Sequence, residues 1–438
     1  MWVRAWLIAG AIVAVSGCDR APEVAPPRVA READDAKAAG DTASSGETPP
    51  PEVRTRVLAP PVEWSDRMQA AVEGANRFAV ALHRLRAADG GNRFCSPFSL
   101  HAALTMTAVG ARGATLDELR AVLHLPDAEG PAAVGDLARY YAAGSPHYEL
   151  AVSSALWGQT GLAWNDRFVT LLDEQFAAGF RTADFAADPD GEREGINAAV
   201  AAATRGRIAA LVPRGAITPL SRLCLTNAIF FKGSWQTTFA GEATSPQPFR
   251  RPDGSTTPVP LMHRKGTEAH LAGDGFQLLA LPYVGADLEM VVILPASAEG
   301  LPALEDRLDA ARLAEWRAAA EQVDVSIWLP RFRLDDRLDA RAVLGSLGVA
   351  TLFVPGSADL TGMTESERLA VAAVLHQAFV EVNEEGTEAA AATAVIANAP
   401  GPPPPRRVEF RADRPFLFLI RDVRHGTILF LGRHAEPP

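Results

Sequence analysis

The sequence predicts an α+β fold in which helices surround a large central β-sheet. Helical patterns and strand-like runs are interleaved, strand-like runs dominate from residue 223 onward, and the closing runs lie close together as hairpin strands do. Hydrophobic residues make up 48% of the 438 residues, which is ample for one large core. A chain of this length can hold two or three average domains, but single domains of this size also exist.

The first residues, 1–17, have the pattern of a secretory signal, with one early Arg, an apolar run and small residues before a cut. The apolar run is too short to span a membrane comfortably. The sequence Val15-Ser16-Gly17-Cys18 resembles a bacterial lipobox, which would make Cys18 the lipidated first residue of the mature chain. A plain signal peptide with an incidental Cys is the alternative.

Residues 18–63 are rich in Ala, Pro, Glu and Asp and carry almost no large apolar side chains. Such a segment cannot bury enough surface to fold, so we expect a disordered tether between the lipid anchor site and a folded domain over residues 64–438. The net charge of −11 argues against a nucleic-acid partner.

The folded region opens with helical patterns. Apolar residues recur at helical spacing from 64 to 85, and a second apolar helix is expected at about 100–109. Thr115 is expected to be the N-cap of a helix over 116–123, and residues 131–150 have the pattern of a helix followed by a turn.

Strand-like runs follow, rich in apolar and β-branched residues. We expect strands at 149–157, 223–231, 278–282, 288–294, 323–328, 374–382, 408–410, 416–421 and 428–432.

Cys95 and Cys224 both lie in apolar runs, and we expect two buried free thiols. A disulfide between them is the alternative. The sequence contains no C-x-x-C, H-E-x-x-H, P-loop or dinucleotide fingerprint, so no metal or cofactor is implied.

The segment 383–396 combines features of a loop and a strand. It follows the strand-like run 378–382, contains Gly386 and a run of small residues, and precedes the Pro-rich stretch 400–405. In an extended conformation, alternate residues from Thr387 to Val395 would lie on one face, and all of them are small or apolar. This face could enter a packed sheet without burying a charge. An Ala-rich surface helix or a flexible linker is the alternative.

Several motifs, in sequence order, resemble those of the serpins. They are Asn92 to Leu100 (Asn-Arg-Phe-Cys-Ser-Pro-Phe-Ser-Leu), Gly110 to Thr115, Thr226 to Trp235 (Thr-Asn-Ala-Ile-Phe-Phe-Lys-Gly-Ser-Trp), Asp359 to Met363, and the closing runs 414–418 and 430–433. The resemblance covers roughly residues 64–438. It implies the serpin fold, with helices around a large mixed central sheet, smaller sheets and an exposed reactive-centre loop at about 383–405.

The segment from Glu384 to Ala394 closely resembles the hinge of the inhibitory serpins. The resemblance assigns the hinge to Glu384, Glu385, Gly386, Thr387, Glu388, Ala389, Ala390, Ala391, Ala392 and Thr393. It implies a suicide-substrate inhibitor of serine or cysteine peptidases, not an enzyme, and therefore no catalytic residues. A non-inhibitory serpin is the second candidate, but such members commonly carry charged, Pro or bulky hinge residues.

The same resemblance assigns Ser96, Ser99, Asn227 and His376 to the shutter, a polar cluster beneath the sheet where strands must part. A Ser–His hydrolase using Ser96 and His376 is a third candidate, although no G-x-S-x-G elbow is present.

Trp235 resembles a residue of the breach, the point where the loop enters the sheet. We expect Glu384 and Arg331 to form an ion pair there, the alternative being two solvated charges.

Family spacing from Gly386 places the scissile region at Ala397, Asn398, Ala399, Pro400 and Gly401, and we favour the Asn398–Ala399 bond. Small residues from 394 to 399 suit an elastase-like or subtilisin-like target. No Lys or Arg lies between 388 and 405, which disfavours a trypsin-like target, and Arg406 lies too far downstream.

The expected partners are a peptidase in a covalent complex and a membrane reached through Cys18. We expect a monomer, exported and lipid-anchored to the bacterial envelope. Serpins that bind polyanions usually have a basic helix near residues 131–150, where this chain has only Arg139, so no polyanion cofactor is expected.

Overall fold

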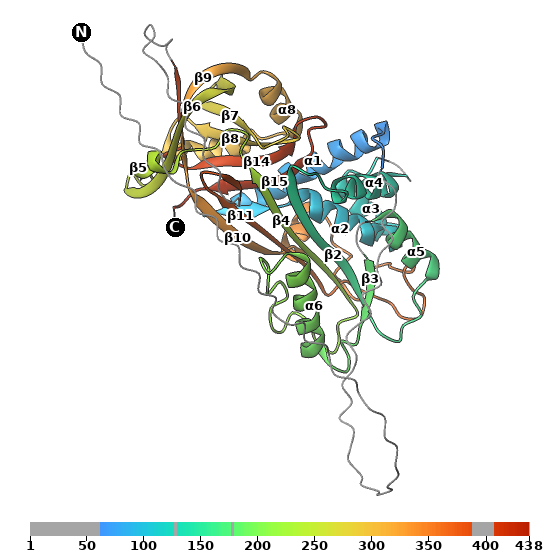
Figure 1. Ribbon diagram of the computed structural model, residues 1–438. Helices are drawn as coiled ribbons and strands as arrows, with labels where there is room; N and C mark the ends of the chain where they lie inside the picture. Colours follow the sequence, from blue (N-terminus) through green and yellow to red (C-terminus); the bar gives the residue numbers. More distant parts are fainter. Residues whose placement is uncertain (1–61, 127–128, 177–178, 388–406, 438) are drawn as a thin grey trace, which may run out of the picture. The chain divides into compact units, whose positions relative to one another are not determined.

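The computed structural model describes residues 62–126, 129–176, 179–387 and 407–437. All described residues belong to one compact unit, Leu58–Pro438. Figure 1 shows α3, α4 and α5 on one side of the long strands β2 and β4, and α6 on the other side. The expected signal, Cys18 and most of the expected tether lie outside the described residues.

The helices lie mostly in the first half of the unit (Figure 1). α1 follows the expected apolar period, and α2 begins at Pro97, whose fixed backbone suits the first turn. Their bounds are α1 Asp66–Ala87, α2 Pro97–Gly110, α3 Gly113–Leu123, α4 Gly130–Ala142, α5 Asp166–Gln175, α6 Pro189–Ala203, α7 Leu301–Asp306, α8 Ala310–Ala318 and α9 Arg341–Leu347.

Among the described residues, the central sheet has six strands in the order β10-β11-β12-β4-β2-β3. It is mixed: β4 runs antiparallel to β2 but parallel to β11. The strands are β2 Tyr148–Gln159, β3 Gly179–Ala183, β4 Leu223–Ser234, β10 Phe332–Asp339, β11 Ala373–Val382 and β12 Gly386–Thr387.

The second sheet has nine strands within the described ranges, in the order β1-β15-β14-β8-β7-β6-β9-β13, with β5 paired to β6. β13 is the last strand on its side and follows directly after residues 388–406. The strands are β1 Arg93–Cys95, β5 Ser245–Arg250, β6 Thr256–Gly273, β7 Phe276–Pro282, β8 Leu288–Pro295, β9 Glu321–Pro330, β13 Val408–Arg411, β14 Phe416–Asp422 and β15 Ile428–His434.

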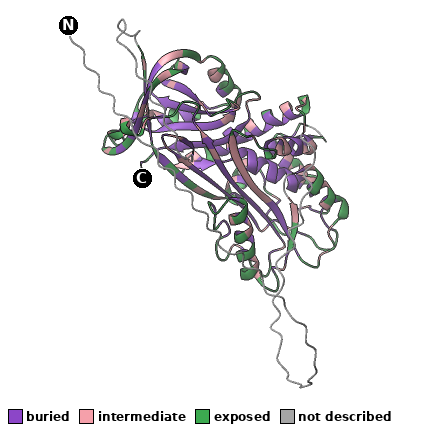
Figure 2. Ribbon diagram, viewed as in Figure 1, coloured by how far each residue is buried: buried purple, intermediate pink, exposed green. Residues whose placement is uncertain are grey.

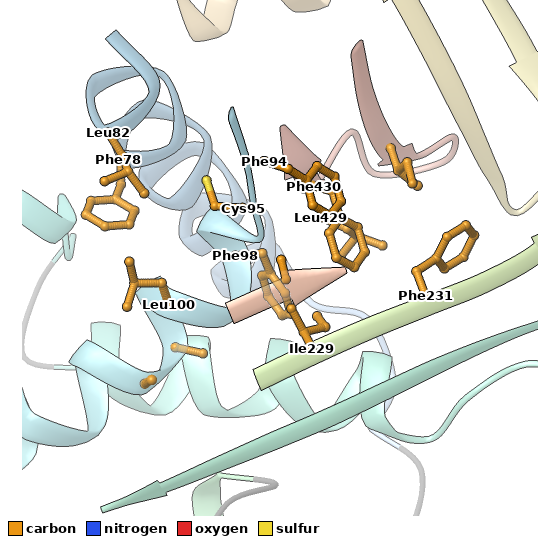
Figure 3. Packing of buried hydrophobic residues seen from close by; sticks show 14 of the residues in the cluster. Phe78, Leu82, Phe94, Cys95, Phe98, Leu100, Ile229, Phe231, Leu429 and Phe430 are labelled. Atoms are coloured by element: carbon orange, nitrogen blue, oxygen red, sulfur yellow. The ribbon is translucent and has the colours of Figure 1, made fainter. Parts of the chain in front are cut away.

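The two faces of the central sheet carry different cores. Along β4, Leu225, Ile229 and Phe231 point to the main core beneath the sheet, whereas Ala228 and Phe230 pack against α6 on the other face. Figure 2 shows that α2, in the main core, is almost wholly buried, while α5 and α6 keep exposed sides. The close view in Figure 3 shows the aromatic centre of the main core, formed by Phe94, Phe98, Phe231 and Phe430.

The expected strands are all present, with ends shifted by a few residues. The Thr115 prediction was wrong: α3 begins at Gly113 after Arg112, and Thr115 lies inside the helix. Its hydroxyl accepts a bond from the Asp359 main-chain nitrogen (3.0 Å) and pairs with the Thr351 hydroxyl (2.7 Å). Thr115 therefore ties α3 to a neighbouring loop and does not cap the helix.

Cys95 and Cys224 are buried and unpaired, as expected. Burial raises the pKa of both thiols, to about 12 for Cys224. A thiol that stays protonated is a poor nucleophile, so neither cysteine is poised for chemistry.

Candidate functional site

The site is a seam between β11 and β4 that is closed at one end and open at the other. The two strands pair directly over seven residues, from Ala373 opposite Cys224 to Phe379 opposite Phe230. Beyond this point β12 lies between them, with Thr387 opposite Val382 on one side and Gly233 on the other. The first two strand residues of the expected hinge, Gly386 and Thr387, are therefore already part of the sheet.

A tight turn returns the chain from β11 into the seam. The Asn383 side-chain oxygen accepts bonds from the main-chain nitrogens of Glu385 (3.0 Å) and Gly386 (3.2 Å). Gly386 has a φ of 153°, and a Cβ there would lie 2.1 Å from the Gly233 carbonyl oxygen. Only glycine fits this approach, which gives a structural reason for the pivot that the sequence suggested.

Thr387 fills the open end of the seam. It is fully buried, and its hydroxyl pairs with the Tyr283 hydroxyl at 2.8 Å. Tyr283 stacks on Trp235 with ring centroids 4.7 Å apart. Burial raises the pKa of Tyr283, so the phenol stays neutral. The sequence places Thr387 at the first inward position, and its burial agrees with that facing.

Main-chain bonds clamp the turn to the segment after β4. The Trp235 nitrogen donates to the Glu385 carbonyl (2.8 Å), and the Phe239 nitrogen donates to the Glu384 carbonyl (2.8 Å). The Trp235 indole nitrogen donates to the Asn383 carbonyl at 2.9 Å. Three successive carbonyls of the turn are thus held by one short stretch of chain.

Glu384 and Arg331 form the expected ion pair. The Arg331 Nε lies 2.7 and 2.8 Å from the two carboxylate oxygens, and the Thr244 hydroxyl also donates to Glu384. The side chain of Glu384 is 11% exposed and that of Arg331 is 46% exposed. Burial opposes ionisation of Glu384, but the bonds from Arg331 and Thr244 outweigh it and lower the pKa of the carboxyl group. The carboxylate therefore stays charged at neutral pH.

A buried polar cluster lies at the closed part of the seam, where β4 crosses α2. The Asn227 amide nitrogen donates to the hydroxyls of Ser99 (2.6 Å) and Ser154 (2.5 Å). Its oxygen lies 2.6 Å from Nδ1 of His376 on β11. Ser96, Ser99, Asn227 and His376 are each at most 2% exposed. The structure thus brings together all four residues that the resemblance assigned to the shutter.

The geometry counts against a Ser–His hydrolase. The His376 Nε2 accepts from the Ser96 main-chain nitrogen at 3.1 Å, whereas the Ser96 hydroxyl donates to the Leu429 carbonyl at 2.7 Å. Burial lowers the pKa of His376 to about 3. A buried neutral imidazole bonded to a backbone amide cannot activate that hydroxyl or meet a substrate.

The remaining predicted site residues, Cys18, Glu388–Thr393 and Ala397–Gly401, lie outside the described residues, and their roles stay predictions. Sequence reasoning missed five contributors: Ser154, Phe239, Thr244, Tyr283 and Asn383. Asn383, directly before Glu-Glu-Gly, could have been recognised as a turn former. No sequence signal marks the other four, and only the folded structure shows their contacts with the site.

The part of the chain that the structure describes contains no cluster of His, Cys, Asp or Glu able to hold a metal ion. No helix among the described residues is both long and apolar enough to cross a membrane.

Comparison with known proteins identifies the class. The model of the family described as "Serpin (serine protease inhibitor)" matches residues 73–437. Antithrombin-III from Mus musculus is 36% identical over 360 residues, covering 80% of this chain and 77% of the relative. Leukocyte elastase inhibitor from Bos taurus is 38% identical over 356 residues, covering 79% and 93%.

Solved structures agree. Serpin48 from the insect Tenebrio molitor superposes with a TM-score of 0.76 at 27% identity, covering 86% of this chain and all of that one. The chain belongs to the serpin family. Serpins are protease inhibitors rather than enzymes, and the resemblance drawn from the sequence motifs is confirmed.

Proposed function

We propose that this serpin is a suicide-substrate inhibitor of serine or cysteine peptidases with pockets for small residues. The observation that carries the proposal is the open end of the seam, where Gly386 and Thr387 already occupy the first positions of a new strand between β11 and β4. This start gives the cleaved loop a defined entry into the sheet, as loop insertion requires.

The covalent step follows from peptidase chemistry. The target's Ser or Cys attacks a carbonyl carbon of the loop; an ester or thioester bond to the peptidase replaces the peptide bond. The nucleophile's proton passes through the peptidase's own base to the departing amine, which remains on the C-terminal part of the inhibitor. This chain supplies only the carbonyl and the amine.

Insertion then competes with hydrolysis. The freed hinge enters the seam as a strand, as serpin reactive loops do, and carries the acylated peptidase with it. Displacing the catalytic groups by about 1 Å costs on the order of 100-fold in rate, so the acyl bond survives. The Thr387 contact sets which side chains face inward, since strand residues alternate between faces.

The loop composition supports the target class. Residues 394–399 are small or aliphatic apart from Asn398, and no Lys or Arg lies between 388 and 405. The favoured cut at Asn398–Ala399 would present Asn398 to an elastase-like or subtilisin-like pocket. The bovine relative named leukocyte elastase inhibitor is consistent with this class.

The N-terminal sequence adds a location. A signal pattern ending at a lipobox-like Cys18, followed by a tether to about residue 63, would hold a monomeric inhibitor at the bacterial envelope. A peptidase attacking the cell surface would meet it there.

The test is incubation with elastase, subtilisin, trypsin and papain, followed by a denaturing gel. We expect a covalent adduct with elastase or subtilisin, and mass spectrometry should find a released C-terminal fragment beginning at Ala399. Elastase with a blocked active-site serine is the matched control and should form no adduct. A first cut after Arg406 would overturn the scissile assignment. Cleavage without an adduct for every peptidase would overturn inhibition and favour a non-inhibitory serpin.

A further inference from the structure

A half-exposed aromatic ladder lies beside the C-terminal end of the reactive loop. Three adjacent strands, β6, β9 and β13, place His263 opposite Trp328 and Trp328 opposite Arg411. One row further along, Lys265 and Glu409 flank Ser326 on the same face. We refer to His263, Lys265, Trp328, Glu409 and Arg411 as the Trp328 face.

Neighbouring side chains hold the Trp328 ring in place. The His263 ring stacks on it with centroids 4.4 Å apart and planes 19° apart, and His263 Nε2 lies 3.1 Å from the Ser326 hydroxyl. The Arg411 guanidinium lies 5.0 Å from the indole centroid. Trp328 nevertheless remains only half-buried, with one part packed against the main core. A large, pre-ordered aromatic surface loses little entropy when a partner covers it, and Trp and Arg dominate binding hot spots.

The charge around this ring is positive. Lys265 and Arg407 are exposed, and Arg411 is half-exposed. The nearby acid Asp413 is buried and pairs with Arg250 (2.8 Å), Arg414 (2.9 Å) and Arg411 (3.4 Å). It offsets part of the Arg411 charge and leaves Lys265 and Arg407 as the exposed cations. Glu409 is the one exposed acid on the defined face. In a chain with a net charge of −11, a basic surface beside the loop stands out.

We propose that the Trp328 face is a secondary contact site for the peptidase held on the loop, and that it fits an acidic surface next to that peptidase's active-site cleft. The inference rests on the proposed function. β13 begins at Val408, ten residues after Asn398 of the proposed scissile bond, so a peptidase that grips this bond would lie within about 35 Å of the strand. Opposite charge then speeds encounter, and the fixed indole lengthens the residence of the first, non-covalent complex.

The test measures association rate constants with the peptidase that forms the adduct, at low and at physiological salt. Lys265→Glu and Trp328→Ser should each slow association about fivefold to tenfold, while the number of inhibitor molecules used per peptidase stays unchanged. Lys265→Glu should also flatten the salt dependence. Both variants should bind the same peptidase more weakly when its nucleophile is replaced by Ala, because that complex depends on recognition alone.

Arg167→Glu is the matched control, because it makes the same charge change on an exposed residue of α5, a helix that Figure 1 shows well away from β6 and β9. It should leave the rate constant unchanged. Lys265 is exposed, so Lys265→Glu should fold normally and can test the proposal even if Trp328→Ser does not fold.

If Lys265→Glu associates at the normal rate and still forms the adduct, the Trp328 face is not a contact site, although the protein remains an inhibitor. A change in sedimentation without a change in association rate would assign the face to a second copy of the chain and overturn the proposal. Absence of any adduct for the unmodified chain would instead overturn the proposed function and this inference with it.

Discussion

The two ends of the seam between β11 and β4 are built in opposite ways. At the open end, the hinge turn is held by main-chain bonds and by an ion pair whose arginine is 46% exposed. At the closed end, the strands pair directly above a cluster that water does not reach, centred on Asn227 and His376.

This difference indicates where resistance to insertion lies. An ion pair with one partner as exposed as Arg331 is worth about 1 kcal/mol or less, because water can take the place of the arginine beside Glu384, which keeps its Thr244 bond. Each buried polar group left without a partner costs about 1–3 kcal/mol. We infer that the open end sets where insertion starts, whereas the closed end sets how much free energy is needed before it proceeds. The predictions below test this division of roles.

The largest effect is expected at Thr387. Thr387→Arg would place a charge at a fully buried position, so the hinge should be expelled from the seam. The variant should be cleaved as a substrate, with adduct formation on a denaturing gel reduced by more than about 100-fold. Glu388→Arg, on the face expected to point outward, is the control and should still inhibit. Equal inhibition by Thr387→Arg would show that the facing is wrong.

Loop cleavage should raise heat resistance. Once cut, the loop can pair along both edges of the seam, adding hydrogen bonds and buried area to the sheet. The melting temperature of the nicked protein should exceed that of the intact protein by at least about 10 °C, measured by circular dichroism. The nicked Thr387→Arg variant should gain much less. An unchanged melting temperature after cleavage would contradict an available vacancy in the sheet.

Acid should weaken the closed end. The pKa of His376 is about 3 in the folded chain against an ordinary value of 6.5, so the unfolded chain takes up the proton first as pH falls. Its stabilising contribution is complete above about pH 6.5 and is lost progressively toward pH 3, amounting to a few kcal/mol. The urea midpoint of the unmodified chain should therefore be lower at pH 5 than at pH 7. The same decrease should be smaller for His376→Gln.

His101, buried and bonded to the Leu123 carbonyl, provides a comparison outside the seam, because burial lowers its pKa to about 4. His101→Gln should also reduce acid sensitivity, but only His376→Gln should change the rate of loop insertion after cleavage. Identical insertion rates for the two variants at pH 5 would remove the shutter role of His376.

The smallest effect is expected at the ion pair of the open end. Arg331→Met removes the partner of Glu384 but leaves the Thr244 bond and the main-chain clamp in place. We expect a melting temperature lower by only about 2–4 °C, with inhibition retained. Arg368→Met, at an exposed residue outside the hinge turn and its contacts, should have no measurable effect. If Arg331→Met lowered the melting temperature as much as a substitution in the shutter, the open end would contribute as much resistance to insertion as the closed end, against our inference.

Much of the fold could be predicted because its strands are apolar and its motifs are local. β10 was not predicted, since most residues of Phe332–Asp339 are charged and Asp335-Asp336 interrupts the apolar alternation that marks a strand. Likewise, β6 runs for 18 residues with Pro258, Pro260 and charged residues that obscure its period. β10 pairs with β11, which is distant in the chain, whereas β6 pairs with its chain neighbours β5 and β7 and also with the more distant β9.

The candidate site likewise contains residues that the sequence predicted and residues that it did not. The Glu384–Arg331 pair and the four shutter residues were predicted through the family resemblance, which carries spatial information that spacing alone does not. Tyr283 could not be predicted, because its contact with Thr387 joins residues 104 positions apart in the chain. No local pattern marks a tyrosine whose partner is a hinge residue.

The pairing of Thr387 with Val382 and Gly233 also has a consequence for loop length. This pairing determines, before the loop is cut, which residues of the inserted strand will face inward. Side chains alternate between the two faces of a sheet, so the position of Thr387 sets the face of every later residue. Point changes on the outward side should therefore be well tolerated. Deleting a single residue just after Thr387 would move every later side chain of the inserted strand to the opposite face. A loop shortened by one small residue should therefore insert poorly, even though its other residues are unchanged.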